Sequence, residues 1–173
     1  MEKTAGIYIH IPFCTIKCMY CDFYSITDRL NDVPVFINSL INEIKKFQTT
    51  YNENWKFDTI FIGGGTPSLL EPKWLEMILL TLEESFNLSN IREITIETNP
   101  GEASLDKLKG YNKIGINRIS IGMQSFNKNI LKFLDRIHSP EDSIQTLKNA
   151  QKSGFDNINA DLIFNIPGQS LNR

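Results

Sequence analysis

Residues 6–21 read GIYIHIPFCTIKCMYC, a β-branched apolar run that passes directly into a loop holding all three cysteines of the chain. The run at residues 6–11 predicts a short strand. The same pattern, an apolar strand that ends in a polar or glycine-rich segment, recurs at residues 58–62, 91–97, 118–121 and 157–166. Five such strands predict that polar groups gather at one edge of a sheet.

Helices are expected between these strands. Apolar residues at helical spacing predict helices over residues 35–47 and from Pro72 to Phe86. In the first, Phe36, Leu40, Ile44 and Phe47 lie at helical spacing. Residues 104–114 predict a shorter helix, and the segment SPED at residues 139–142 supplies the N-cap, proline and acidic first turn of another, which ends at Gly154.

This alternation indicates an α/β fold with a parallel sheet. A (β/α) barrel is favoured over a doubly wound sheet, because polar segments follow every strand rather than meeting at one crevice. Residues 1–173 show no linker and are expected to form one domain. No helix follows the last strand, which a parallel sheet would need as cover. We therefore expect a partial barrel, truncated after about five βα units, that forms the N-terminal part of a longer fold.

Composition excludes several classes of protein. The 173 residues carry 18 Lys+Arg and 20 Asp+Glu, a formal net charge of −2, with 41% hydrophobic residues. This balance gives no basic surplus for nucleic acid. No apolar run is long enough to span a membrane, and the first ten residues do not resemble a signal peptide. A cytoplasmic globular protein is expected.

The clustering of Cys14, Cys18 and Cys21 points to a bound metal, since cysteines used only for packing would be scattered. One alternative is a zinc site with His10 as the fourth ligand. Cubane iron–sulfur clusters also normally take four cysteines. Three cysteines would leave one iron without a protein ligand and open to chemistry.

The spacing Cys14-x3-Cys18-x2-Cys21, with Tyr20 before the last cysteine, resembles the signature loop of the radical S-adenosylmethionine (SAM) superfamily. The wider string YIHIPFC at residues 8–14 resembles the branch that contains the oxygen-independent coproporphyrinogen III oxidases of porphyrin biosynthesis and the related haem chaperones of the HemW type. Matching motifs run from Tyr8 to Asp161. The resemblance implies a [4Fe–4S] cluster on the three cysteines, with SAM chelating the fourth iron.

The resemblance also implies which residues contact the cofactors. The glycine-rich segment GGGTPS at residues 63–68 lacks the Gly-Lys-[Ser/Thr] ending of a phosphate loop, and it would otherwise be no more than a tight turn. Glu97 ends a strand, and Asp161 lies within an apolar strand, where a carboxylate without a partner is costly. The residues expected to bind cofactor are Tyr8, Tyr20, Gly64, Gly65, Thr66, Glu97, Gln124, Arg136 and Asp161.

Two departures favour the haem chaperones over the oxidases. The oxidases have a further cysteine two positions after the third, where this chain has Phe23, and they have a longer segment before the cluster. We therefore expect a protein that binds haem and passes it to acceptor haemoproteins. A coproporphyrinogen III oxidase is the alternative, and a zinc-stabilised binding module is a third. Whether SAM is cleaved, which residue ligates haem and which protein donates electrons are open from the sequence.

Overall fold

The computed structural model describes residues 3–50 and 55–170. Its five strands form one parallel sheet in the order β1-β2-β3-β4-β5, so each strand pairs with the next one in the chain. The strands are β1 (Lys3–Ile11), β2 (Trp55–Gly64), β3 (Glu93–Thr98), β4 (Arg118–Gln124) and β5 (Asn157–Leu162). A parallel sheet wound in sequential order is the arrangement of a barrel wall and confirms the predicted fold class.

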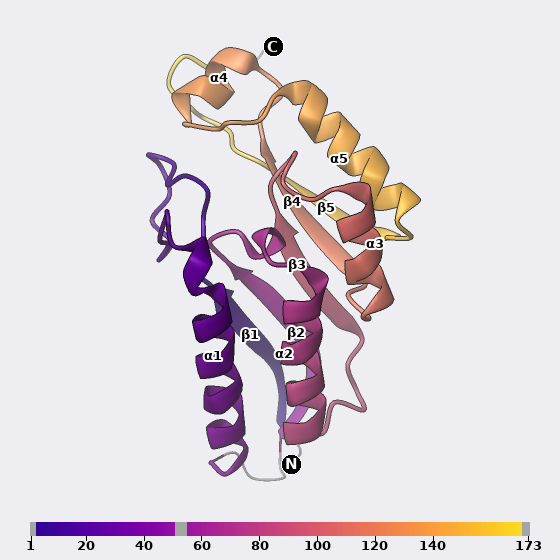
Figure 1. The fold of residues 1–173 in the computed structure, drawn as a ribbon. Coiled ribbons are helices and arrows are strands. Elements are labelled where there is room, and N and C mark those ends of the chain that lie inside the picture. Colours follow the sequence, from indigo (N-terminus) through magenta and orange to yellow (C-terminus); the bar gives the residue numbers. More distant parts are fainter. Residues whose placement is uncertain (1–2, 51–54, 171–173) are drawn as a thin grey trace.

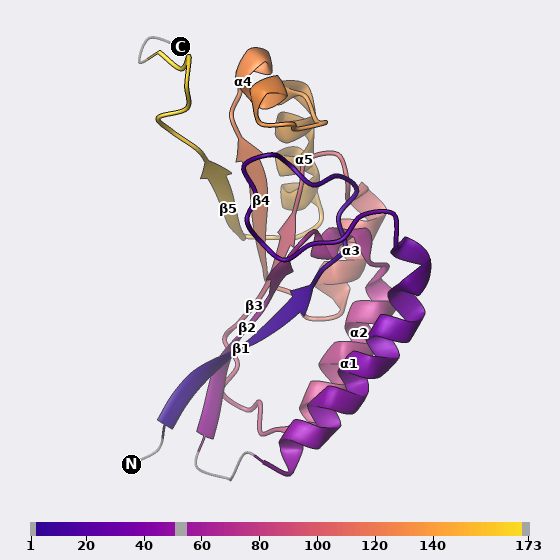
Figure 2. The ribbon, with the colours of Figure 1, turned by 90° about the vertical axis from the view of Figure 1, so that its left-hand side faces the viewer.

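Helices cover one face of this sheet (Figures 1 and 2). They are α1 (Val33–Gln48), α2 (Pro72–Ser85), α3 (Leu105–Lys113), α4 (Lys128–Phe133) and α5 (Pro140–Lys152), with short 3₁₀ turns η1 (Leu30–Asp32) and η2 (Pro67–Leu69). In Figure 2, α1, α2, α3 and α5 lie on the same side of the strands, while none of the helices in the described part of the chain lies on the opposite face. The segment between β1 and α1 passes over the end of the sheet where the strands finish.

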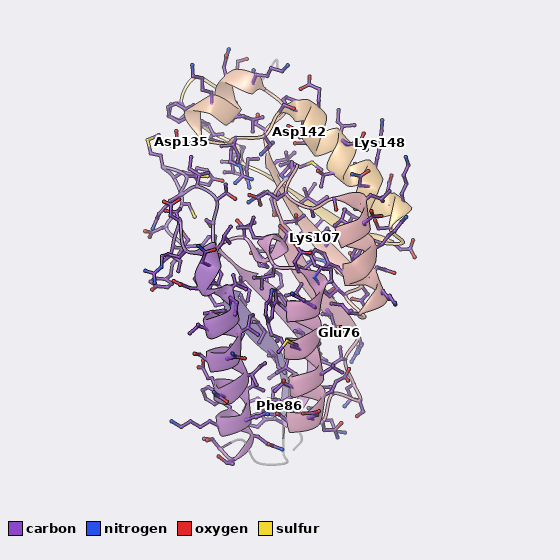
Figure 3. The ribbon with its side chains drawn as sticks, viewed as in Figure 1. Glu76, Phe86, Lys107, Asp135, Asp142 and Lys148 are labelled. Atoms are coloured by element: carbon purple, nitrogen blue, oxygen red, sulfur yellow. The ribbon has the colours of Figure 1, made fainter. Side chains whose placement is uncertain are left out.

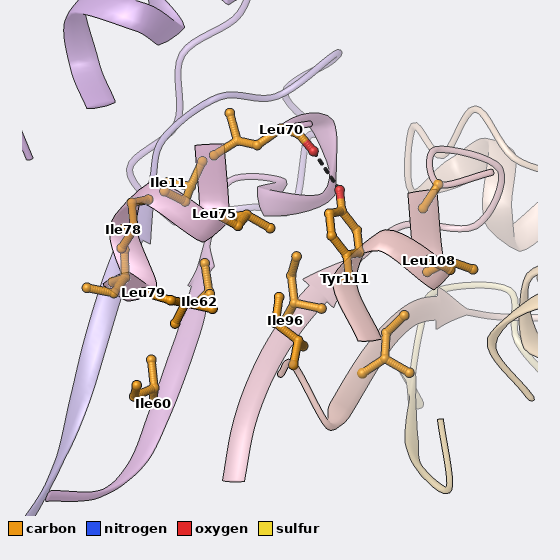
Figure 4. Close-up of a cluster of buried hydrophobic side chains, with 14 of the residues drawn as sticks. Ile11, Ile60, Ile62, Leu70, Leu75, Ile78, Leu79, Ile96, Leu108 and Tyr111 are labelled. Atoms are coloured by element: carbon orange, nitrogen blue, oxygen red, sulfur yellow. Dashed lines mark hydrogen bonds between the residues drawn. The ribbon is translucent and has the colours of Figure 1, made fainter. Parts of the chain in front are cut away.

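The period-two alternation of the strands separates these two faces. Apolar side chains such as Ile9, Ile62 and Ile96 are buried toward the helices. Figure 4 shows this core, with Tyr111 of α3 reaching across it to donate a 2.6 Å hydrogen bond to the Leu70 carbonyl oxygen after η2. The alternate positions, which are polar or aromatic, face the side of the sheet without helices and lead up to the cysteine loop.

The helix starts and stops follow the sequence closely. Ser104 caps α3 through its side chain, and Ser139 and Asp142 form a complete capping box at the start of α5. Helix α1 buries Val33, Ile37 and Ile44, whereas Phe47 in its last turn is 43% exposed.

Several strand bounds differ from the prediction. β1 begins at Lys3 rather than at residue 6, β2 spans Trp55–Gly64 rather than 58–62, and β3 spans Glu93–Thr98 rather than 91–97. β4 does not stop before Gly122 but continues to Gln124, with a register shift after Ile121. β5 ends at Leu162 rather than at residue 166, because its last ladder partner is Gln124, where β4 itself ends. Helix α4 was not predicted, since six residues are too few to show a helical period.

Candidate cofactor site

A pocket of about 360 Å³ lies at the carboxyl end of the strands, beneath the cysteine loop. Of the twelve residues predicted to bind metal or cofactor, eleven line it: Cys14, Cys18, Tyr20, Cys21, Gly64, Gly65, Thr66, Glu97, Gln124, Arg136 and Asp161. They come from all five strand ends. Parallel strands place these ends at one rim, which is why residues up to 147 positions apart meet there.

The cysteine loop is closed by backbone hydrogen bonds at its base. The Cys14 N–H donates to Ile26 O (2.9 Å), and the Ile26 N–H donates to Pro12 O (2.8 Å). Within the loop, the Cys21 N–H donates to Cys18 O (3.0 Å). These bonds hold the three thiols at the mouth of the pocket. Burial raises the pKa of the Cys14 thiol, more than hydrogen bonding to Thr66 lowers it.

The segment after α4 forms hydrogen bonds with the tip of the cysteine loop. Asp135, labelled in Figure 3, follows α4 with a positive φ of 55°. Its carboxylate accepts a 3.1 Å hydrogen bond from the Met19 N–H, and its carbonyl oxygen accepts one of 3.7 Å from the Cys18 thiol. Asp135 is not among the residues predicted from the sequence. Its position next to Arg136 was the available signal.

The glycine-rich segment after β2 packs backbone against backbone with the start of the cysteine loop. The Gly65 N–H donates to Ile11 O (2.8 Å), and the Thr66 N–H donates to Phe13 O (2.7 Å). A Cβ on Gly65 would lie 2.7 Å from Phe13 O, so only glycine permits this approach. Gly64 has a φ of 115°, a conformation that side chains disfavour.

Glu97 ties this segment to β3. Its Oε2 accepts a 3.1 Å hydrogen bond from the Gly64 N–H. Burial raises the pKa of the Glu97 carboxyl, against the lowering effects of that bond and of His10, and the neighbouring Asp161 raises it further. The carboxylate faces the pocket, as predicted.

Tyr8 is the one predicted residue outside the pocket. It lies on β1 two residues before His10, is 56% exposed, and stacks on Phe61. Its hydroxyl lies 3.0 Å from His10 Nδ1, while His10 Nε2 lies 2.8 Å from Tyr24 O. Both ring nitrogens of His10 are therefore engaged, which argues against His10 as the fourth ligand of a zinc ion.

Gln124 is held in a strained backbone conformation at the end of β4. Its φ is 61°, and the Ser125 N–H donates across it to Met123 O (2.7 Å), which closes a γ-turn. His138 Nε2 lies 3.1 Å from the same Met123 oxygen. Burial lowers the pKa of His138, and Arg136 lowers it further. Because a carbonyl oxygen only accepts, the Nε2–H of His138 donates this bond. Neither the γ-turn at Gln124 nor the hydrogen bond from His138 to it was predicted from the sequence.

Arg136 lies at the centre of the polar groups in the pocket. Its guanidinium donates to Gly122 O (2.8 Å), to Asn99 Oδ1 (2.5 Å) and to the Cys18 sulfur (3.8 Å). Nearby, Glu102 accepts hydrogen bonds from Asn99 (2.9 Å) and from the Thr15 hydroxyl (3.2 Å), although burial raises the pKa of its carboxyl. Glu102 also escaped the sequence analysis. It follows the strand by four residues, in a turn where an acidic residue carries no signal.

The expectation that Asp161 is buried is wrong. It is exposed on β5, and it accepts hydrogen bonds from Ser120 (3.0 Å) and Asn159 (2.8 Å) on the side of the sheet without helices. Its apolar neighbours belong to an edge strand of this sheet rather than to a central one. Tyr20 is 40% exposed, and its partial burial raises the pKa of its phenol more than Arg136 lowers it.

The residues present fit an iron–sulfur cluster and, beside it, a ligand that binds the cluster through its amino and carboxylate groups. Three thiols open on one pocket, and the Arg136 Nε is buried without a partner beside them. Gly122 has no side chain, and the side chains of Gln124, Asn99 and Arg136 converge where its Cβ would lie. Over residues 3–50 and 55–170, no three His, Cys, Asp or Glu side chains, the three cysteines included, lie close enough together to hold a single metal ion.

The fold and the pocket together define a class: a partial (β/α) barrel with a three-cysteine loop over the carboxyl ends of its strands. Residues 8–173 match the Radical SAM superfamily, and the chain belongs to that superfamily.

Known relatives place it more narrowly. The chain is 38% identical over 171 residues to "Heme chaperone HemW" of Lactococcus lactis, covering 99% of this chain and 44% of the relative. It is 41% identical over 168 residues to "Heme chaperone HemW" of Escherichia coli, with 96% and 44% covered. Among solved structures it is similar to the coproporphyrinogen III oxidase HemN of Escherichia coli, described as a radical SAM enzyme. That match has a TM-score of 0.86 at 30% identity and covers 98% of this chain and 39% of that one.

The chain thus spans less than half the length of the curated relatives that it matches. In the part of the chain that the structure describes, no helix combines the length and apolarity needed to cross a membrane.

Proposed function

We propose that Cys14, Cys18 and Cys21 hold a [4Fe–4S] cluster, that SAM occupies the adjoining pocket, and that the protein binds haem and delivers it to acceptor haemoproteins. The observation that carries the proposal is the single pocket shared by the three thiols and eight further residues of the predicted set. The repeated similarity to proteins named haem chaperones supports the haem part. Tyr8, which lies below the pocket, is proposed to act through His10.

Each group in the pocket has a definite task in this proposal. Gly64, Gly65 and Thr66 line the pocket where a small polar ligand would bind, and the Glu97 carboxylate, which also lines it, suits the amino group of such a ligand. The guanidinium of Arg136, with its free Nε–H, suits a carboxylate. When bound, the cluster supplies single electrons. The chain's own residues orient the ligand and exclude water from the pocket.

The second candidate is an oxygen-independent coproporphyrinogen III oxidase. The structural similarity to HemN favours it, since the TM-score of 0.86 covers nearly the whole chain. Phe23 argues against this candidate. It lines the pocket, and the resemblance places a cysteine at this position in the oxidases. The two candidates share the cluster and differ in what they do with a tetrapyrrole.

The first experiment is anaerobic reconstitution with iron and sulfide, followed by metal analysis and an absorption spectrum. The proposal expects about four irons per chain, and it expects no cluster when Cys14, Cys18 and Cys21 are replaced by alanine. Stoichiometric zinc in a colourless protein would refute both candidates. Haem is then added: a saturable Soret band without turnover of coproporphyrinogen supports the chaperone, and turnover supports the oxidase.

SAM binding is tested separately with the E97Q variant. Loss of one charge-assisted hydrogen bond should weaken binding about tenfold. The matched control is E76Q, since Glu76 is an exposed residue of α2 on the helical side of the sheet (Figure 3). Equal affinities in the two variants would contradict the proposed task of Glu97.

A further inference from the structure

Asn99 joins three of the residues that bond to the cysteine loop, Thr66, Glu102 and Arg136. It follows β3, and its amide group makes three hydrogen bonds. Nδ2 donates to Thr66 Oγ1 (3.0 Å) and to Glu102 Oε2 (2.9 Å), while Oδ1 accepts from Arg136 Nη2 (2.5 Å). The amide has no unused donor, and none of these partners is on its own strand.

The direction of these bonds determines where the Thr66 proton points. A hydroxyl group has one proton to donate. Because Thr66 Oγ1 accepts from Asn99, its proton is free for the Cys14 sulfur, 3.5 Å away. Glu102 helps to hold the amide in this orientation, since its carboxylate accepts from the NH₂ group of Asn99.

The other side of Asn99 acts on a second cysteine. Its Oδ1 anchors one nitrogen of the Arg136 guanidinium, and the other terminal nitrogen donates to the Cys18 sulfur at 3.8 Å. Arg136 and Cys18 are 118 residues apart in the chain. One amide therefore aligns a donor to each of two cysteine sulfurs.

We propose that Asn99 is a positioning residue that raises the reduction potential of the cluster by aligning Thr66 and Arg136 as hydrogen-bond donors to Cys14 and Cys18. Hydrogen bonds to the sulfurs are among the factors that set the potential of an iron–sulfur cluster. A donor stabilises the sulfur more when the cluster carries the added electron, because the reduced cluster is more negative. Loss of the alignment makes reduction harder.

The test is a redox titration of the reconstituted chain without SAM, with dithionite and mediators, read by electron paramagnetic resonance. N99A removes the amide without changing the charge. The reduction equilibrium should fall about tenfold, which for a one-electron couple is a potential about 59 mV lower. Iron content should stay that of the wild type, since the three cysteines are intact.

The matched control is N117A. Asn117 also uses both ends of its amide, accepting from the Ile94 N–H (2.8 Å) and donating to Arg92 O (2.9 Å), but at the opposite end of the sheet. Its loss should lower stability and leave the potential unchanged. An N99A potential equal to that of N117A would overturn the inference.

Thr66 supplies a second pair of variants, which keeps the inference testable if N99A does not fold. T66V removes the hydroxyl and should lower the potential, whereas T66S keeps the donor and should not. A T66V chain with the wild-type potential overturns the inference. In the T66V/N99A double variant the shift should be smaller than the sum of the single shifts, and full additivity would show that Asn99 does not act through Thr66.

The inference rests on the cluster of the proposed function and not on haem. The two failures can be told apart. A wild-type chain that takes up no cluster refutes the proposed function, while a cluster with a potential insensitive to Asn99 refutes this inference alone.

Discussion

Replacing Gly65 by alanine should separate the two backbone segments that form the site. The added Cβ would lie 2.7 Å from Phe13 O and 2.8 Å from Pro12 O, whereas ordinary contact begins at 3.4 Å. The segments must part by about 0.7 Å to accommodate it. The Thr66 N–H bond to Phe13 O, now 2.7 Å, would then lengthen beyond the normal range of a hydrogen bond.

The magnitude follows from these two effects. Overpacking of a rigid site costs about 1–3 kcal/mol, and a weakened buried hydrogen bond costs about 1 kcal/mol. We expect G65A to lower the free energy of unfolding by about 3 kcal/mol, which for a chain of this size is a fall of about 6–12 °C in Tm. Because Cys14 follows Phe13 directly, reconstituted iron per chain should fall as well.

The assay is urea denaturation of the cluster-free chain, with G6A as the control. A Cβ on Gly6 would come equally close to a neighbour, 2.6 Å, but that neighbour is the Thr59 side-chain oxygen, which can rotate away. G6A should therefore cost less than about 1 kcal/mol. Equal losses of unfolding free energy in the two variants would refute the argument that close backbone contact makes glycine necessary at position 65.

Three further results are expected. Y111F leaves the Ser68 and Leu70 carbonyl oxygens without the Tyr111 hydroxyl and should cost about 2 kcal/mol in urea denaturation; a loss under about 0.5 kcal/mol would contradict it. The folded-state pKa of His138 lies below 6.5, so the unfolded chain takes up this proton first and stability falls as pH drops below 6.5 toward the folded pKa. H138Q should lack that part of the pH dependence, and an unchanged profile would argue against it. S139A removes the N-cap of α5 and should lower Tm by about 2–4 °C with iron uptake intact, since the cap lies outside the hydrogen bonds to the cysteines; lost iron uptake would show a wider role.

The fold could be predicted because its signals are local. A strand shows as alternation over a few residues and a helix as spacing of three and four, and both are present without reference to the rest of the chain. Helix starts were predicted well where a side chain makes the cap, as at Ser104 and Ser139. Strand ends were predicted less well, because Gly122 and Leu162 lie where pairing with a neighbouring strand decides how far the ladder runs.

The site could be predicted in part. Cysteine spacing and the glycine-rich segment are short patterns in one stretch of chain, and eleven of the twelve predicted residues share the pocket. Tyr8 lies on β1 outside the pocket, and Asp161 was taken as buried although it lies exposed on an edge strand. Both positions depend on how a side chain sits relative to other strands.

The sequence by itself determined the parallel α/β architecture, the three-cysteine loop and the superfamily, since each follows from residues close together in the chain. Only the tertiary structure decided how Asn99, Glu102, Asp135 and His138 take part. Their bonds join residues from 3 to 117 positions apart, so they depend on strand register and on the path of each loop. Such geometry is the sum of many weak packing choices, and no single stretch of sequence records it.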